Sequence, residues 1–233
     1  MINKYCRDYA LSHGHLNFKK GKRRDAITGD IIDTDVVDID NPYTSNDPEE
    51  RRIIIIDNAS NLSTENGLKK MEIIDKMSKY GIMLRNQLKY IFVLIQHQAQ
   101  AQEGIENQKL NKIKPSSDGL ADCKTTSRDA NMLIGLYSPF KYGLREYEGY
   151  DITKFRNHIR FMEVIEDRDY GANGQICPLY FDGAVSMFKE LPKPNDSVSL
   201  QKIYEYIDSI NNKKQGKQFI IYSIKNLINK FIK

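Results

Sequence analysis

The stretch that decides the fold is RRIIIIDN, residues 51–58, in which four consecutive isoleucines lead into Asp57. Isoleucine is β-branched and favours strands, and a strand that is apolar at every position is typical of a sheet covered on both faces. In open α/β sheets, ligands bind beyond the carboxyl ends of the strands. We therefore expect a buried strand over 53–56 that places the Asp57 carboxylate at a ligand-binding edge.

A long helix and a second apolar strand follow this run. The pair Ser63-Thr64 is typical of a helix start, with Glu65 in the first turn, and apolar residues then recur at helical spacing to about Leu88. We expect one long amphipathic helix, with a possible break near Gly81. The run YIFVLI, residues 90–95, is the second strand. Strand, helix and strand predict a βαβ unit, which implies a parallel sheet with a right-handed crossover.

The remaining segments extend this pattern. We expect a Gln-rich loop or helix over 99–114, strands over 131–137 and 159–166, a glycine-bearing turn over 171–174 and a strand over 176–181 that completes a hairpin, and helices over 199–211 and 219–233. The predicted fold class is α/β, with a mostly parallel sheet flanked by helices, a C-terminal β-hairpin and a small helical C-terminal extension.

The N-terminal part has a different character. A short helix is expected over 5–15, a basic turn over 19–24, and a long loop over 25–50 with at most a short strand at 31–32 or 36–37. These features predict three parts, namely an N-terminal helix and acidic loop over 1–49, an α/β core over 50–192 and a basic helical tail over 193–233.

Charge is distributed unevenly along the 233 residues, although the formal net charge is only +4. Residues 1–24 contain seven lysines or arginines and a single acid, residues 25–50 contain nine acids and no base, and residues 201–233 contain seven lysines and two acids. Basic ends are compatible with a polyanionic partner, and a solvated surface is the alternative explanation.

The chain shows no targeting or disulfide pattern. It contains no run of about 20 apolar residues and no apolar signal segment, which predicts no membrane span and a cytoplasmic setting. Cys6, Cys123 and Cys177 are widely spaced, form no CxxC pair and are expected to be free thiols.

A strand that ends in an aspartate is also typical of the Walker B element of nucleotide-hydrolysing ATPases. Its usual companion is a GxxxxGK[ST] loop, whose backbone N–H groups and lysine hold the β- and γ-phosphates. That motif occurs nowhere in the 233 residues. Gly14 and Gly21-Lys22 come nearest, but they lack the spacing and the Ser or Thr that binds the metal.

The order of these features resembles the RecA-like ATPase domain of DnaB-type replicative helicases, especially the divergent versions encoded by large tailed phages. The resemblance covers about residues 50–192. It rests on IIIID at 53–57, VLIQHQ at 93–98, KPSSDGL at 114–120 leading to RDAN at 128–131, EDRD at 166–169, and FDG at 181–183. It implies ATP and Mg²⁺ as cofactors, single-stranded DNA as a partner, a hexameric ring, and a location in the host cytoplasm if the chain is phage-encoded.

The resemblance also implies roles for individual residues. Asp57 would bind Mg²⁺ through its water shell, and Gln96 or His97 at the next strand end would sense the γ-phosphate. Arg168 would reach the nucleotide of a neighbouring subunit and stabilise charge on the γ-phosphate. The family usually has a basic residue two positions before this arginine, where this chain has Glu166. Ordinary strand-end capping, and a surface ion pair of Arg168 with a neighbouring aspartate, are the alternative explanations.

For DNA, the resemblance points to loops after the Gln strand and before Asp129. The available cations are Lys112, Lys114, Lys124 and Arg128. Helicases of this family often carry an arginine in the second loop, where this chain has Ala121, so Lys124 would have to take its place.

Three functions remain open at this point. The absent phosphate loop removes most contacts to the transferred phosphoryl group, so the chain alone is expected not to hydrolyse ATP. It could be the C-terminal part of a helicase ATPase that needs a complementary ATPase half. It could be a non-catalytic nucleic-acid-binding or ring-forming accessory protein. It could also be an unrelated α/β protein in which Asp57 merely ends a strand.

Overall fold

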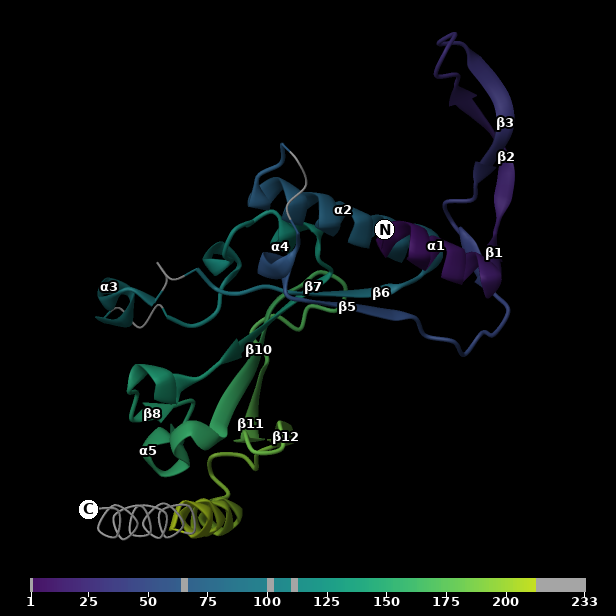
Figure 1. Ribbon diagram of the computed structural model, residues 1–233. Helices are drawn as coiled ribbons and strands as arrows, with labels where there is room; N and C mark the ends of the chain where they lie inside the picture. The colour runs from purple at the N-terminus through teal and green to yellow at the C-terminus, as the bar shows by residue number, and fades with distance from the viewer. Residues whose placement is uncertain (1, 64–66, 100–102, 110–112, 213–233) are drawn as a thin grey trace, which may run out of the picture. The chain divides into compact units, whose positions relative to one another are not determined.

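The computed structural model describes residues 2–63, 67–99, 103–109 and 113–212 (Figure 1). Contacts within the chain define two compact units, Met1–Asn131 and Met132–Lys233. The three-part division of the chain stays a prediction. The helix predicted over 219–233 lies outside the described residues, as do Thr64 and Glu65 of the predicted helix start.

The first unit is built on the predicted βαβ arrangement. Strands β5 (Ile53–Asp57) and β6 (Ile91–Ile95) pair in parallel with Asp57 opposite Ile95, and helix α2 (Lys70–Leu88) connects them. The two strands and the helix between them are therefore confirmed, but the predicted full burial of 53–56 is wrong, because alternate residues of both strands are exposed. Their parallel register brings both carboxyl ends to the same edge of the pair.

Helix α2 begins at Lys70 and not near Ser63. The Glu72 carboxylate accepts a 2.7 Å hydrogen bond from the Lys69 backbone N–H, which satisfies a donor at the start of the first turn. Gly67 has a φ of 82°, a left-handed conformation that glycine adopts without strain and a helix cannot continue through. The later start therefore follows from local backbone geometry.

Gly81 does not break α2. It is buried, and a Cβ atom at this position would lie 2.5 Å from a ring carbon of Phe92. The missing side chain therefore lets the helix pack directly on β6. Beside this contact lies the main cluster of the first unit, formed by Cys6, Ala10, Tyr43, Leu84, Leu88 and Tyr90.

Three N-terminal elements contribute to that cluster. They are α1 (Ile2–Ser12), β1 (Gly14–Leu16) and β4 (Tyr43–Ser45), and the last two pair antiparallel. The Tyr43 hydroxyl donates a 2.8 Å hydrogen bond to the Ala10 carbonyl, so β4 is fixed to the end of α1.

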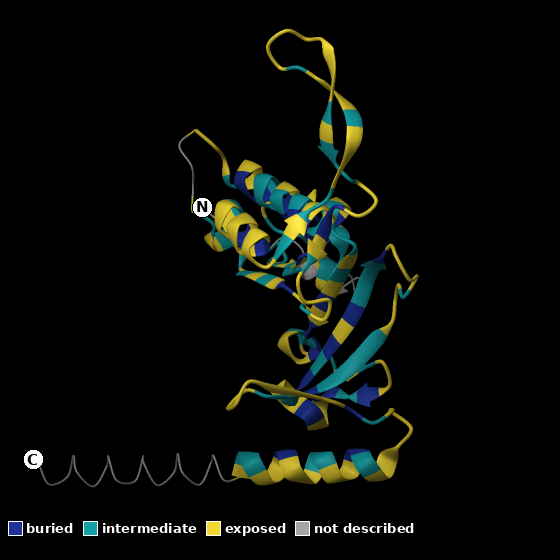
Figure 2. Ribbon diagram, turned by 90° about the vertical axis from the view of Figure 1, so that its right-hand side faces the viewer, coloured by how far each residue is buried: buried dark blue, intermediate teal, exposed yellow. Residues whose placement is uncertain are grey.

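The turn predicted over 19–24 and the loop predicted over 25–50 are wrong in large part. Strands β2 (Phe18–Arg24) and β3 (Ile31–Val37) form an antiparallel hairpin that is mostly exposed (Figure 2). The basic strand faces the acidic one, and Lys20 contacts Asp35 at 2.8 Å. Opposite charges across the ladder favour the pairing. The charges of the two strands therefore partly offset each other.

Short elements occupy the rest of the first unit. They are the 3-10 turns η1 (Ala59–Asn61) and η3 (Ser117–Gly119) and the short helices α3 (Ile105–Lys109) and α4 (Thr126–Asp129).

The second unit contains a four-stranded sheet in the order β12-β11-β10-β7. Its strands are β7 (Met132–Tyr137), β10 (Ile159–Asp167), β11 (Ile176–Asp182) and β12 (Met187–Glu190). Between β7 and β10 lie η4 (Pro139–Tyr142), β8 (Glu146–Tyr147), β9 (Tyr150–Asp151), α5 (Ile152–Phe155) and η5 (Arg156–His158). A further helix starts at 197 and is described to 212.

The expectation of a mostly parallel sheet is wrong. The hairpin predicted between 159–166 and 176–181 is confirmed, but all four strands of this sheet pair antiparallel. Parallel neighbours need a crossover of about a dozen residues or more, usually a helix. The segment between β7 and β10 instead folds into short turns and a small hairpin, and it returns the chain antiparallel, with Phe161 opposite Tyr137. Within the described residues, β5 and β6 alone are parallel.

Aromatic side chains hold the second unit together. The Tyr147 ring lies 5.1 Å from that of Tyr137 and 4.7 Å from that of Phe161, and the Tyr150 and Phe155 rings are 6.1 Å apart. Burial raises the pKa of Tyr147 to about 12. This cluster is therefore a packed core and not a set of reactive phenols.

Candidate functional site

The carboxyl ends of β5 and β6 bring the predicted residues of the first unit together. Asp57 ends β5 and is exposed, and Gln96 and His97 follow directly after β6. The Asn58 side-chain amide lies 3.1 Å from the His97 Nε2 atom, so the two strand ends are in contact. Asn58 was not singled out from the sequence, although its position directly after Asp57 was the available signal.

Gln96 and His97 have different environments. The Gln96 amide nitrogen donates hydrogen bonds to the carbonyls of Ala121 and Cys123, and its oxygen accepts a 2.8 Å hydrogen bond from the Thr126 hydroxyl. All of these partners belong to the segment before α4 or to its first residue. Gln96 therefore connects the end of β6 to the segment that the sequence assigned to DNA, whereas His97 faces the end of β5.

Further polar contacts fix the same segment to η1 and α2. The Ser60 hydroxyl donates to the Asp122 carboxylate at 2.7 Å, and the Lys70 ammonium donates to the carbonyls of Ser60 and Leu62, each at 2.7 Å. Sequence reasoning missed Asp122 and Lys70. The role of Asp122 depends on a contact 62 positions away in the chain, and no motif marked Lys70, whose partners are 8 and 10 positions away.

Two hydrogen bonds connect α2 to α4 and to the residue before it. The Thr125 hydroxyl donates to Asp75 at 3.0 Å, and the Ser78 hydroxyl donates to Asp129 at 2.6 Å. Hydrogen bonds from Lys79 and Thr125 lower the pKa of the Asp75 carboxyl. The segment is thus held from β6, η1 and α2 together.

The predicted DNA-contacting cations lie on or near this segment. Lys124 is exposed between the buried residues Cys123 and Thr126, and Arg128 is exposed on α4. Lys114 is exposed, and its carbonyl accepts a 3.4 Å hydrogen bond from the Gln98 amide. Lys112 lies outside the described residues.

Arg168 is exposed in the second unit, on the turn between β10 and β11. The neighbouring Asp167 carboxylate accepts backbone N–H groups of Asp169 at 3.0 Å, Tyr170 at 3.2 Å and Ala172 at 3.0 Å. These bonds lower the pKa of Asp167, and the Ala172 N–H has the largest effect. Asp167 therefore organises the turn that presents Arg168.

The site offers a carboxylate to a metal ion, and the sequence offers no phosphate loop. An exposed carboxylate such as Asp57 can bind Mg²⁺ through the water that this ion retains. Among the described residues, no group of three or more His, Cys, Asp or Glu side chains is arranged to hold a metal directly. The sequence also lacks the glycine-rich loop that would cradle a triphosphate.

Solved structures, but no family model and no curated protein, are similar to this chain. No protein-family model matches the chain, and no curated protein matches it significantly. Two solved structures are similar to it at a TM-score of 0.50 and 18% identity, each over 63% of this chain. One is described as an ATPase domain, and the other as a DnaB-like replicative helicase with its interactions with primase.

The likeness shows the fold alone. The chain is of the mixed α/β class. Its fold is similar to that of DnaB-like helicase ATPase domains. The match spans 46% of the first of these solved chains and 32% of the second. Among the described helices, none combines the length and apolar character needed to cross a membrane.

Proposed function

We propose that this chain is the C-terminal part of a DnaB-like replicative DNA helicase ATPase, which couples ATP hydrolysis to movement on single-stranded DNA in the cytoplasm. The observation that carries the proposal is the contact between two parallel strand ends, with Asp57 on one and Gln96 and His97 on the other. This is the edge at which α/β sheets bind ligands.

In this proposal each residue has a separate task. Asp57 would hold Mg²⁺ through the water shell of the ion, and the ion would supply positive charge against the charge that develops on the phosphates. His97 faces the phosphates beside Asp57. Gln96 transmits the state of the site to residues 121–126 through its three hydrogen bonds.

The partners are single-stranded DNA and either copies of this chain in a ring or a complementary ATPase half. Lys114, Lys124 and Arg128 supply charge for the DNA phosphates, and this binding is weakened by salt. Lys112 takes the same role in the proposal. Arg168, presented by the turn around Asp167, completes the site of a neighbouring subunit.

The chain alone is inactive in this proposal, because no GxxxxGK[ST] loop holds the phosphates. The test is to mix it with a phosphate-loop half of a DnaB-like ATPase and to measure binding of the halves and DNA-stimulated ATP hydrolysis separately. We expect hydrolysis with the wild-type chain and a loss of at least about 100-fold with Asp57→Ala. Asp30→Ala, which removes an exposed carboxylate from the β2–β3 hairpin, is the matched control. Halves that bind each other without hydrolysing ATP would refute the proposal.

A non-catalytic accessory protein on the same scaffold is the second candidate, and the absent phosphate loop favours it. This alternative predicts that the chain binds single-stranded DNA with the same affinity with and without a slowly hydrolysed ATP analogue and Mg²⁺. It also predicts that Asp57→Ala leaves DNA binding unchanged. Nucleotide-dependent DNA binding that Asp57→Ala abolishes would exclude it.

A further inference from the structure

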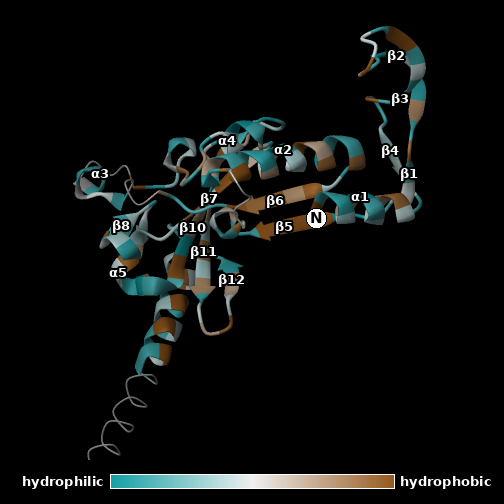
Figure 3. Ribbon diagram, turned by 45° about the horizontal axis from the view of Figure 1, so that its top comes forward, coloured by the Kyte–Doolittle hydropathy of each residue, from teal (hydrophilic) through white to brown (hydrophobic). Residues whose placement is uncertain are grey.

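The parallel pair β5–β6 has one covered face and one bare face. On the covered face, Ile54 and Phe92 pack against the main cluster of the first unit, and Leu94 packs against the cluster around Ile74. Figure 3 shows both strands as strongly hydrophobic, with α2 running along the pair. The alternate residues of both strands remain exposed: Ile53 by 57%, Ile55 by 61%, Ile91 by 48%, Val93 by 38% and Ile95 by 41%.

Such a surface is costly to leave in water. Five β-branched side chains lie together on the bare face, and burying the apolar area that they leave in water is favourable. Strands of parallel sheets that are apolar at every position are normally covered on both sides. Contiguous exposed apolar patches of this kind mark interaction sites. A second surface is therefore expected to cover the face.

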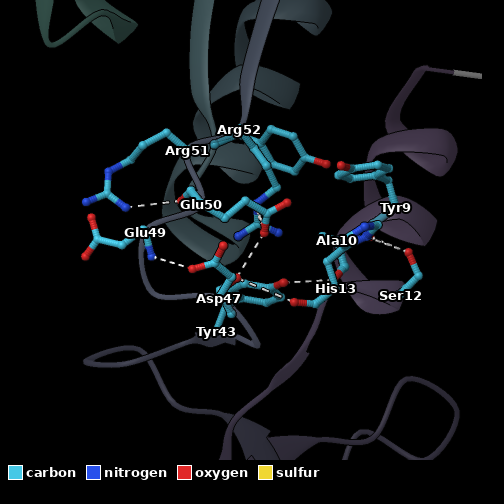
Figure 4. Close-up of polar contacts among 12 residues, drawn as sticks. Tyr9, Ala10, Ser12, His13, Tyr43, Asp47, Glu49, Glu50, Arg51 and Arg52 are labelled. Atoms are coloured by element: carbon cyan, nitrogen blue, oxygen red, sulfur yellow. Dashed lines mark hydrogen bonds and ion pairs between the residues drawn. The ribbon is translucent and has the colours of Figure 1, made fainter.

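The ends of the bare face carry opposite charges. The alternation along β5 places Arg51 at the start of the same stripe as Ile53 and Ile55, and the exposed Asp57 at its end. Figure 4 shows Arg51 and Arg52 directed to opposite sides of the chain. Arg52 is buried on the covered side, and Arg51 is exposed. The stripe thus runs from a cation, through isoleucines, to a carboxylate.

We infer that the bare face of β5–β6 is the interface of a two-fold dimer of this chain. A two-fold axis that lies in the plane of the interface, perpendicular to the strands, would run the two β5 strands antiparallel. Arg51 of one copy would then lie beside the partner's Asp57, and the reverse contact would form at the other end. The isoleucines and Val93 would pack as two sheets stack face to face. Because the stripe has unlike ends, a second copy of it is its electrostatic complement.

This inference rests on the exposed face and not on the helicase proposal. It has one consequence for that proposal, because the dimer would close the side on which Asp57 is exposed. The dimer would therefore be a resting form, from which Asp57 becomes available to metal and nucleotide only on dissociation.

Sedimentation equilibrium of the full chain, from micromolar to submillimolar concentrations, tests the inference without nucleotide. We expect a monomer–dimer equilibrium for the wild type. Ile55→Asp should weaken the dimer by roughly 100-fold or more, because the two-fold axis brings two carboxylates into the apolar centre. Ile27→Asp, the same substitution at a hairpin residue that is 95% exposed, is the matched control and should leave dimerisation unchanged. Thermal unfolding of each variant verifies that it is folded.

The charge reversals Arg51→Asp and Asp57→Arg test the orientation. Each alone should weaken the dimer, since it places like charges together, and the double variant should restore it. A wild type that stays monomeric at every concentration would overturn the inference and leave the face to another protein. A dimer that tolerates Ile55→Asp would also overturn it. A dimer that Ile55→Asp breaks but that the double charge reversal fails to restore would overturn the antiparallel arrangement.

Discussion

The Thr126 hydroxyl donates a 2.8 Å hydrogen bond to the side-chain oxygen of Gln96, and this contact ties the end of β6 to the start of α4. The Gln96 amide nitrogen is satisfied at the same time by two carbonyls of the segment before that helix. Both amide hydrogens and the side-chain oxygen of Gln96 therefore form hydrogen bonds to residues 121–126, an arrangement called here the Gln96 clamp. In the proposed function, these hydrogen bonds would carry a change at the end of β6 to the segment that contains Lys124.

Replacing Gln96 with leucine should release the segment. We expect Gln96→Leu to lower the free energy of unfolding by about 2 kcal/mol, because the three hydrogen bonds of the Gln96 side chain are lost, while the Thr126 hydroxyl and the Cys123 N–H still donate to the Cys123 and Ala121 carbonyls. Hydrogen exchange should accelerate over 121–126 and stay slow in β5. Gln98→Leu, which removes a single long hydrogen bond to the Lys114 carbonyl, is the control and should change exchange there far less. Equal effects of the two variants would contradict the clamp.

Arg52 should stabilise the first unit through packing. Its guanidinium carbon lies 4.3 Å from the Tyr43 ring centroid and 5.2 Å from that of Tyr90, and its Nε lies 3.7 Å from the Glu50 carboxylate. The Nε and Nη1 atoms are buried without a hydrogen-bond partner. We expect Arg52→Ala to cost about 2–4 kcal/mol in urea unfolding.

Two further variants separate packing from charge. Arg52→Met keeps most of the stem and removes the buried charge, so it should cost less than Arg52→Ala. Arg51→Ala, at the exposed neighbour, should change stability by less than about 0.5 kcal/mol. If Arg52→Met were as destabilising as Arg52→Ala, the charge and not the packing would be the main contribution.

The sequence predicted the elements whose patterns are local. Four isoleucines ending in Asp57, and the helical spacing up to Leu88, are sufficient to define the βαβ unit, because β-branching and the 3.6-residue period act within one segment. The glycine turn likewise predicted the β10–β11 hairpin. The partners of Gln96 and the direction of β7 depend on contacts between distant segments, which no local pattern contains.

The β2–β3 hairpin shows where local composition misled the prediction. Lysines and aspartates disfavour strands singly, so 19–24 and 25–50 looked like turn and loop. In the fold, Lys20 of β2 lies against Asp35 of β3, and Lys19 contacts Asp38 and Asp40, which follow β3, so the acidic segment supplies countercharges to the basic strand. Predicting this outcome requires the register between the strands, which composition does not contain.

Gly81→Ala should destabilise the chain although alanine is the better helix former. The helix-propensity gain is about 1 kcal/mol, but the new Cβ would meet the Phe92 ring at 2.5 Å, and overpacking in a core costs about 1–3 kcal/mol. We expect a net loss in urea unfolding. Adding Phe92→Leu should recover part of the loss, and the double-mutant cycle measures that coupling. A stabilised Gly81→Ala variant would contradict the direct helix–strand contact.

DNA affinity should depend on Lys124 more than on the basic strand β2. Lys20 is paired with Asp35. Because Asp35 already offsets its charge, Lys20 should attract DNA phosphates weakly, and Lys20→Ala should change the affinity for labelled single-stranded DNA by less than about twofold. Lys124→Ala should weaken binding severalfold and reduce its salt dependence by about one phosphate contact. Fluorescence anisotropy across a salt series measures both. If Lys20→Ala weakened DNA binding more than Lys124→Ala did, the DNA-binding site would lie on the β2–β3 hairpin.

The turn that presents Arg168 should lose order in acid. The pKa of Asp167 is lowered in the folded chain, first by the Ala172 N–H and then by the N–H groups of Asp169 and Tyr170. Its ionised form therefore stabilises the turn at pH values above the unfolded pKa of about 4, and this contribution is lost as the pH falls through the lower folded-state pKa.

Amide hydrogen exchange measured as a function of pH, after correction for intrinsic rates, checks this expectation. The Ala172 amide should be protected at neutral pH and lose protection in acid, whereas Asp167→Asn should show weak protection throughout, because a neutral amide accepts these bonds less strongly. Asp169→Asn is the control, since the Asp169 carboxylate receives none of the three turn bonds. Protection at Ala172 that survives Asp167→Asn would show that the backbone holds the turn, and that Arg168 is positioned without the Asp167 carboxylate.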